Sequence, residues 1–316
     1  MLDNKGENSD LKYKEIDLVH LFSILWKRKI TIILLTSIFA VSSVFYALSI
    51  PNYYNSTVLF NVIQDEQSGF DSLASQYGGL ASMAGIDIPQ TSSKDRASLV
   101  MQTIQSREFM KHLITFDGVL EGIIATKGFD KSTNTIIYDE DSFNSSSAEW
   151  IREAKYPYKR IPSYLEAHEE FTKNMIEVKQ DRKSGFISVS VEHISPIFAF
   201  NLLEKIIDEV NKIIKDHDLK ESTMAIDYLN EQASISSSAN LQNSINSIYE
   251  SQLRKQMLSN IREEYIINVI DEPFVPEKKT GPTRSIICIV ITLIGGILSV
   301  LYVLIDSLIF KKRKKT

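Results

Sequence analysis

Residues 30–50 read ITIILLTSIFAVSSVFYALSI, and residues 285–305 read SIICIVITLIGGILSVLYVLI. Each stretch has 21 residues and no charged side chain. At about 1.5 Å of rise per residue, a helix of that length spans roughly 30 Å, which is the thickness of the hydrocarbon core of a bilayer. We therefore predict a transmembrane helix at each stretch. A cleavable signal peptide is the alternative for the first stretch, but the apolar region of such peptides is only about 7–15 residues long.

Basic residues near the ends of these helices predict their orientation. Positions 10–29 hold five Lys and Arg residues and positions 51–70 hold none. The tail is basic throughout residues 311–315, so both termini are predicted to be cytoplasmic. The chain then divides into a cytoplasmic segment at 1–29, a transmembrane helix at 30–50, a periplasmic domain at 51–284, a second transmembrane helix at 285–305 and a cytoplasmic basic tail at 306–316.

Composition excludes several classes of protein. The formal net charge of the 316-residue chain is -5, which argues against a nucleic-acid partner. One cysteine, Cys288, cannot form an internal disulfide, and the five histidines have no metal-ligand spacing. The sequence contains no phosphate-binding motif and no nucleophile–base set. We expect no cofactor, no metal and no catalytic residue, and His193, at the end of an alternating strand, is expected to be structural.

The predicted periplasmic domain combines strands and helices. Residues 53–63 alternate between two faces and are rich in β-branched and aromatic types, which predicts a strand. Residues 174–180 and 186–192 flank a turn that ends in Gly185, so they are predicted to form a hairpin. Residues 264–271 supply a fourth strand. The expected fold is α+β. Because the first and last strands adjoin the membrane helices, the small mixed sheet is expected to be membrane-proximal.

The longest periodic block runs from Pro196 to about Arg262. Its apolar residues recur at three-to-four spacing, and residues 232–249 carry no charge. A continuous helix would be long and polar enough to need neighbours from other copies of the chain. The alternative is a break near Ser236–Ser238 that gives an antiparallel pair. Helices are also predicted at 94–116 and 163–173. The residues expected at an oligomer interface are Leu241, Ile245, Ile248 and Leu253.

Three stretches carry a resemblance to a known family. Glu15-Ile16-Asp17-Leu18, followed by residues 24–29 and the first membrane helix, resembles the opening of the Wzz-type polysaccharide co-polymerases, the O-antigen chain-length determinants. Residues 184–191, followed by Ser195-Pro196, are similar to that family's Ser-Gly-containing strand and helix start. Before the second membrane helix, a degraded version of its proline-rich motif consists of Pro273, Pro276, Pro282 and Arg284, with Lys279 at the position of the middle proline.

The proline-rich segment also has a direct physical interpretation. Proline fixes φ and lacks an N–H donor, so these residues would give a stiff extended link, with Arg284 at the membrane interface. They could equally do no more than end a strand before a helix begins.

Small residues follow one stripe of each membrane helix at 4-3-4 spacing, which permits close packing within one chain or between chains. The predicted packing residues are Thr36, Ala40, Ser43 and Ala47 in the first helix and Cys288, Thr292, Gly295 and Ser299 in the second.

The resemblance implies a function. It implies an inner-membrane homo-oligomer without catalytic activity, which sets the chain length of O-antigen or a related surface polysaccharide. Its partners would be further copies of itself, the polysaccharide polymerase and the growing lipid-linked polysaccharide. Within the same superfamily, the alternatives are an adaptor of capsule or exopolysaccharide export and a membrane activator of a separate tyrosine kinase. Outside it, the alternative is a receptor or enzyme anchored by two helices.

Overall fold

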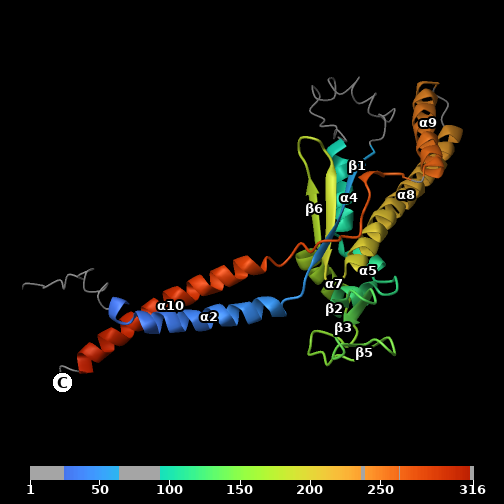
Figure 1. Ribbon diagram of the computed structural model, residues 1–316. Coiled ribbons are helices and arrows are strands. Elements are labelled where there is room, and N and C mark those ends of the chain that lie inside the picture. Colours follow the sequence, from blue (N-terminus) through green and yellow to red (C-terminus); the bar gives the residue numbers. More distant parts are fainter. Residues whose placement is uncertain (1–24, 64–92, 236–238, 263, 314–316) are drawn as a thin grey trace, which may run out of the picture. The chain divides into compact units, whose positions relative to one another are not determined.

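The computed structural model describes residues 25–63, 93–235, 239–262 and 264–313 (Figure 1). The chain divides into two compact units. Unit 1 consists of Met1–Pro51 with Pro282–Thr316, and unit 2 consists of Asn52–Gly281. The division therefore falls within three residues of the boundaries expected for the periplasmic domain.

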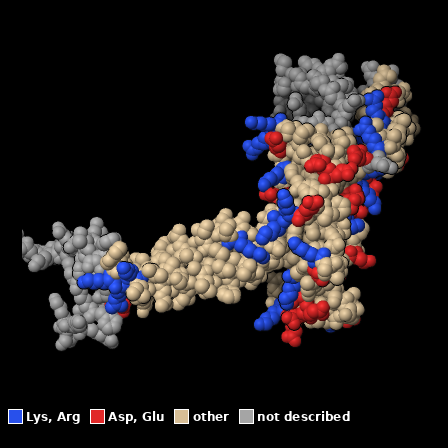
Figure 2. All heavy atoms as spheres, in the orientation of Figure 1, with Lys and Arg blue, Asp and Glu red and all other residues tan. Residues whose placement is uncertain are grey.

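Unit 1 is a pair of long helices, α2 (Lys29–Ser49) and α10 (Arg284–Arg313), which lie side by side (Figure 1). Both are long and apolar enough to cross a membrane, over Lys29–Ser49 and Arg284–Asp306. Many of their large apolar side chains are exposed, such as Phe45 at 72% and Ile289 at 63%. Figure 2 shows an uncharged surface along these helices, whereas acidic and basic side chains are spread over unit 2. The two helices predicted at 30–50 and 285–305 are present.

Unit 2 is built on a four-stranded sheet in the order β6-β7-β1-β8. The predicted strands are confirmed, but the sheet is not mixed in direction, because all three strand pairs run antiparallel. Consecutive strands β6 and β7 are joined by a tight turn, and β1 pairs with strands from far along the chain. The bounds are β1 Tyr54–Val62, β6 Ile176–Gln180, β7 Ile187–His193 and β8 Ile267–Asp271.

Helices cover one face of this sheet (Figure 1). Val58 and Phe60 of β1 are fully buried against them, and burying each such side chain contributes roughly 1.5–3 kcal/mol. The predicted helix at 94–116 is divided, because the Ser106 side chain accepts a hydrogen bond from the Phe109 N–H and caps a new helix. The helices of this layer are α4 Ser93–Ile104, α5 Arg107–Leu113, α7 Tyr164–Glu170 with the π-helix η1 Phe171–Met175, and α8 Pro196–Ile235.

The region between α5 and α7 contains small elements that were not predicted. A short helix leads into two hairpins, whose own small core contains Ala125, Phe143 and Trp150. The last two of these strands have only two residues each, and the first two, TKGFD and TIIY, do not alternate between apolar and polar residues, so none shows a period of two in the sequence. The elements are α6 Val119–Ile124, β2 Thr126–Asp130, β3 Thr135–Tyr138, β4 Phe143–Asn144 and β5 Glu149–Trp150.

The block at 196–262 is not one continuous helix. Helix α8 ends at Ile235, and α9 (Ala239–Ile261) packs beside it (Figure 1). The pair is antiparallel, because Gln256 Nε2 donates to Thr223 Oγ1 at 2.9 Å and Lys215 Nζ donates to the Arg262 carbonyl at 3.3 Å. The expectation of a continuous helix was therefore wrong and the broken alternative is confirmed, although α8 alone is 40 residues long.

Candidate functional site

The proline-rich segment lies along the first strand of unit 2. Ser56 Oγ donates to the Phe274 carbonyl at 2.8 Å, and Tyr53 N donates to the Gly281 carbonyl at 3.0 Å. Pro276 is buried and Pro273 is half-buried. Since prolines have no N–H to extend the ladder beyond Asp271, the segment follows β1 without forming a strand.

In unit 1, Pro282 and Arg284 stand at the start of α10. Arg284 Nη2 donates to the carbonyl of Ile50, the C-cap residue of α2, at 3.2 Å. A cation at a helix C-terminus is favourable because carbonyl groups there have no partner within the helix. Arg284 therefore joins the end of one candidate membrane helix to the beginning of the other.

The two stripes of small residues meet each other within a single chain. Thr36 Oγ1 lies 3.1 Å from Ser299 Oγ, and Cys288 Sγ lies 3.7 Å from the Ser43 carbonyl. All eight residues of the stripes are buried or half-buried; they include Ala40, Ala47, Thr292 and Gly295. Arg28 and Asp306 form an ion pair between the same two helices. The described faces turned away from this contact carry the large apolar side chains.

The residues proposed for an oligomer interface lie on α9 in different environments. Ile245 is buried at 6% exposure, Ile248 is half-buried, and Leu253 is 36% exposed. The side chain of Leu241 lies outside the described residues. Larger apolar exposure occurs elsewhere on the helix pair, at Met224 and Tyr228 of α8 and at Met257 and Ile261 of α9.

A buried cluster of charged and polar side chains connects α4, α8, α9 and the residues just before β8. Asp218 of α8 accepts hydrogen bonds from Arg96 Nη2 and the Tyr265 hydroxyl, each at 2.7 Å, and pairs with Lys255 Nζ at 3.1 Å. Burial, followed by the neighbouring Asp218 carboxylate, raises the pKa of the Tyr265 hydroxyl, so Tyr265 stays protonated and donates. Asn211 Oδ1 also accepts from the N–H groups of Tyr265 and Ile266.

Sequence reasoning did not find this cluster, although one signal was present. Asp218 follows Val210 and Ile214 at four-residue intervals, on the face of α8 that packs against the core. An acidic residue at a core position of an amphipathic helix indicates a buried partner.

His193 is structural, as expected. Its Nδ1 accepts from Ser195 N at 3.0 Å, and its Nε2 lies 3.0 Å from the Gly122 carbonyl, so both ring nitrogens are used by the backbone. Burial lowers its pKa from 6.5 to about 4. The imidazole is neutral at pH 7.

This shift predicts a loss of stability in acid. Because the pKa of His193 is lower in the folded state, its contribution is complete above about pH 6.5 and disappears as the pH falls towards 4. The loss should be about 3 kcal/mol in the free energy of unfolding. Urea unfolding at a series of pH values should show that His193→Gln flattens this dependence and that His217→Gln, at an exposed position, does not. Parallel curves for wild type and His193→Gln would refute the assignment.

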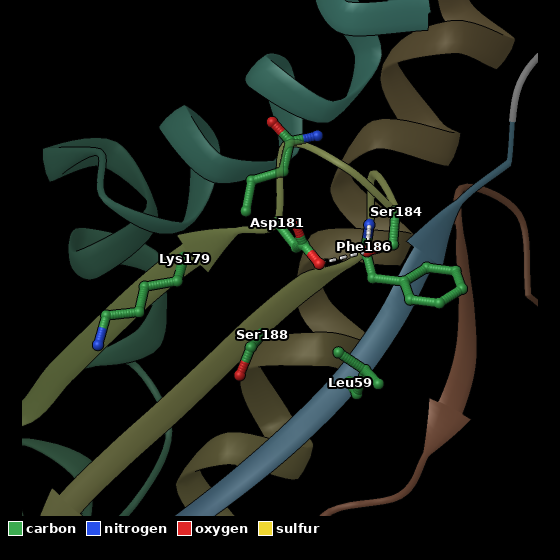
Figure 3. A pocket seen from close by; sticks show the side chains of 7 residues that line it. Leu59, Lys179, Asp181, Ser184, Phe186 and Ser188 are labelled. Carbon is green, nitrogen blue, oxygen red and sulfur yellow. Dashed lines mark hydrogen bonds between the residues drawn. The ribbon is translucent and has the colours of Figure 1, made fainter.

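An open cavity of about 420 Å³ lies at the β6–β7 hairpin, beside the strand residue Leu59 (Figure 3). Gly185 has a φ of 77°, a left-handed conformation that glycine adopts without strain, which explains the glycine at this position. Polar groups here stabilise the hairpin itself. Asp181 accepts a hydrogen bond from Ser184 Oγ at 3.0 Å (Figure 3), and Gln180 Nε2 donates to the Gly185 carbonyl at 3.3 Å. The cavity therefore belongs to the turn architecture of residues 181–186.

Comparison with known proteins gives one family match. The model of the Wzz family, described as chain length determinant protein, matches residues 14–115. This range contains the N-terminal motif, α2, β1, α4 and α5, and the other two motifs lie outside it. Over residues 14–115, this match confirms the resemblance inferred from the sequence. None of the curated proteins compared with the chain matches it.

Two solved structures are similar. A full-length bacterial polysaccharide co-polymerase has 13% identity and a TM-score of 0.40, with 93% of this chain and 99% of that chain covered. A fragment of WzzB, the polysaccharide co-polymerase from Salmonella Typhimurium, has 13% identity and a TM-score of 0.28, with 73% of this chain and 100% of that chain covered.

Proposed function

We propose that this chain, a Wzz-family protein by its chain-length-determinant match over residues 14–115, regulates the chain length of O-antigen or a related surface polysaccharide as a homo-oligomeric co-polymerase of the inner membrane. The family match is the observation that carries the proposal. The two candidate membrane helices, which precede and follow unit 2 in the sequence, support it. In this role the protein binds and positions other molecules and catalyses no reaction.

In the proposed topology both termini are cytoplasmic and unit 2 is periplasmic. The basic residues before α2 and in the tail favour this orientation, since Lys and Arg are retained on the cytoplasmic side. The ion pair between Arg28 and Asp306 holds these two helix ends together, and this topology requires both ends to lie on one side of the membrane.

For the homo-oligomer, we propose that the α8–α9 pair packs against other copies of the chain. Each helix carries exposed apolar residues one turn apart, Met224 with Tyr228 on α8 and Met257 with Ile261 on α9. Exposed apolar patches of this kind are typical of protein interfaces. Leu253 and Ile248 can contribute at the margin, whereas Ile245 is already buried within the chain.

For the polysaccharide polymerase, we propose contact through the membrane helices. Because their small residues face each other within one chain, the polymerase would meet the large apolar faces, which include Phe45 and Tyr302. The growing lipid-linked polysaccharide would then be held near unit 2.

Deletion of the gene in its host tests the proposal. The expected result is loss of the modal cluster of polysaccharide lengths on a gel, replaced by a random ladder, with restoration by a complementing copy. An unchanged ladder with polysaccharide retained inside the cell would indicate the export adaptor instead. An unaltered surface polysaccharide would contradict a role in its synthesis.

A further inference from the structure

A second cavity, of about 430 Å³, lies in unit 2 where β7 meets the end of α7, the π-helix η1 and the start of β2. Its size is within the range of ligand sites, roughly 300–1,000 Å³. The polar side chains in its wall are Tyr53, Thr126, Glu170, Asn174, Glu192 and His193. These residues come from separate parts of the chain and are brought together only by the fold.

One of the carboxylates that line this cavity belongs to Glu192, a half-buried residue of β7. Among the residues that the structure describes, none donates a hydrogen bond to the Glu192 carboxylate. Burial, followed by the charge of Glu177, raises the pKa of Glu192. The Glu192 oxygens are not among the buried side-chain atoms that lack a partner, so they are open to water, and sugar hydroxyls can take the place of that water.

Glu170 and Asn174 line the same cavity as Glu192. Asn174 Nδ2 donates to Glu170 Oε1 at 2.9 Å, so this carboxylate is held in place and keeps a second oxygen for a ligand. Both residues belong to the junction of α7 with η1, and π-helical turns occur often at functional sites. Both ring nitrogens of His193, by contrast, already contact backbone groups, so His193 forms part of the cavity wall without binding the ligand.

The charge of the wall restricts the ligand. Two carboxylates line the cavity, and no Lys or Arg is among the described residues that do. A phosphate or a uronic acid would meet like charge there without a compensating cation. Hydroxyl and amine groups would find acceptors in Glu170 and Glu192, and both an acceptor and a donor in the Asn174 amide.

We propose that this cavity binds a neutral or amino sugar, with sugar hydroxyls or amines donating to Glu192 and Glu170. The inference rests on the proposed function, since a regulator of polysaccharide length encounters such sugars. In the chain, Tyr53 follows the last residue of α2 by four positions, which is at most about 14 Å of extended backbone. One residue of the cavity wall, Tyr53, is therefore close in sequence to a candidate membrane helix. The lipid-linked end of a polysaccharide would lie at the membrane.

The test measures binding of sugar to the full-length protein in detergent micelles. The probe is the set of oligosaccharides released by mild acid from the surface polysaccharide of the host, titrated calorimetrically in the presence of EDTA. The chelator ensures that a cation held by the carboxylates does not account for the heat. Glu192→Gln and Glu170→Gln are expected to weaken binding about ten-fold each, the usual effect of losing a hydrogen bond to a charged group.

Glu169→Gln is the matched control. Glu169 is the neighbour of Glu170 on the same helix, but it pairs with Lys173 at 2.5 Å and does not line the cavity. It should bind the oligosaccharides as tightly as wild type. Thermal unfolding of each variant checks that the fold is retained.

Two results would overturn the inference: no binding to the wild-type protein, or equal binding by all three variants. Neither result would affect the proposed function, which the deletion experiment tests separately. A lost modal cluster on deletion, combined with absent binding here, would mean that chain length is controlled without sugar recognition in this cavity.

Discussion

Replacement of Asp218 by alanine is expected to destabilise unit 2 by about 3–5 kcal/mol, the usual cost of removing one partner of a buried ion pair. The Asp218 side chain is 10% exposed, and its partners Arg96 and Lys255 are 19% and 24% exposed. Loss of the carboxylate would leave two poorly solvated cations close together and would remove the acceptor of the Tyr265 hydroxyl. The cluster connects α4, α8, α9 and the residues just before β8. The packing of α8 and α9 around Asp218 should therefore loosen first.

Urea unfolding of the full chain in micelles, followed by circular dichroism, measures this effect. Asp216→Ala is the control, since Asp216 stands on the same helix but is exposed, and its replacement should change the free energy of unfolding by less than about 0.5 kcal/mol. Asp218→Asn keeps the shape and a hydrogen-bond acceptor while it removes the charge, so its loss should be intermediate. Equal stability of the Asp218→Ala and Asp216→Ala variants would show that the cluster does not hold the helices.

The elements that the sequence predicts well are those with a clear period. The alternation of residues 53–63 continues over nearly the whole of β1, because one face of that strand is buried against the helices. The two uncharged stretches also correspond to α2 and α10. In these segments, local composition and the buried environment lead to the same structure.

The residues around Ile235 do not themselves decide between a continuous helix and a break. Ser, Asn and Gln between residues 232 and 249 neither continue an apolar stripe nor stop a helix as proline would. Helices α8 and α9 are held together by contacts between residues far apart in the chain, such as Lys255 with Asp218 and Gln256 with Thr223. Such pairs have no local signature.

The candidate sites show the same limit. The spacing of small residues predicted which faces of the membrane helices are buried or half-buried, but only the structure shows that each face has the other as its partner. Glu170 and Glu192 carry no motif, and they line one cavity because η1 and β7 pack together. Sequence patterns therefore identified faces, and the three-dimensional contacts identified partners.

Substitution of Gly295 by alanine is expected to loosen the contact between α2 and α10. A Cβ atom at this position would lie 2.5 Å from both Cβ and Cγ of Phe39. These atoms are at the base of the Phe39 side chain, so rotation of the ring cannot relieve the overlap and the helices must move apart. Overpacking of this kind costs about 1–3 kcal/mol.

Gly296 provides the matched control in the next position of the same helix. A Cβ atom there would lie 3.9 Å from Thr36 Cγ2, an ordinary contact. Gly296→Ala should therefore keep the pair and gain up to about 1 kcal/mol of helix propensity. The helix contact is measured by the yield of an intramolecular disulfide between cysteines introduced at Thr36 and Ser299, in a Cys288→Ser background, since these two hydroxyls lie 3.1 Å apart.

The expected result is a lower disulfide yield for Gly295→Ala than for Gly296→Ala, together with a shifted polysaccharide length distribution for Gly295→Ala alone. Disulfide-linked dimers instead of internal links would show that the small residues pair between copies. The comparison also decides how the membrane helices act. If the close pair within one chain shapes the surface that the polymerase meets, then opening that pair must change chain length even though Gly295 is buried and does not itself reach the partner. An unchanged length distribution despite a lost disulfide would assign chain-length control to unit 2.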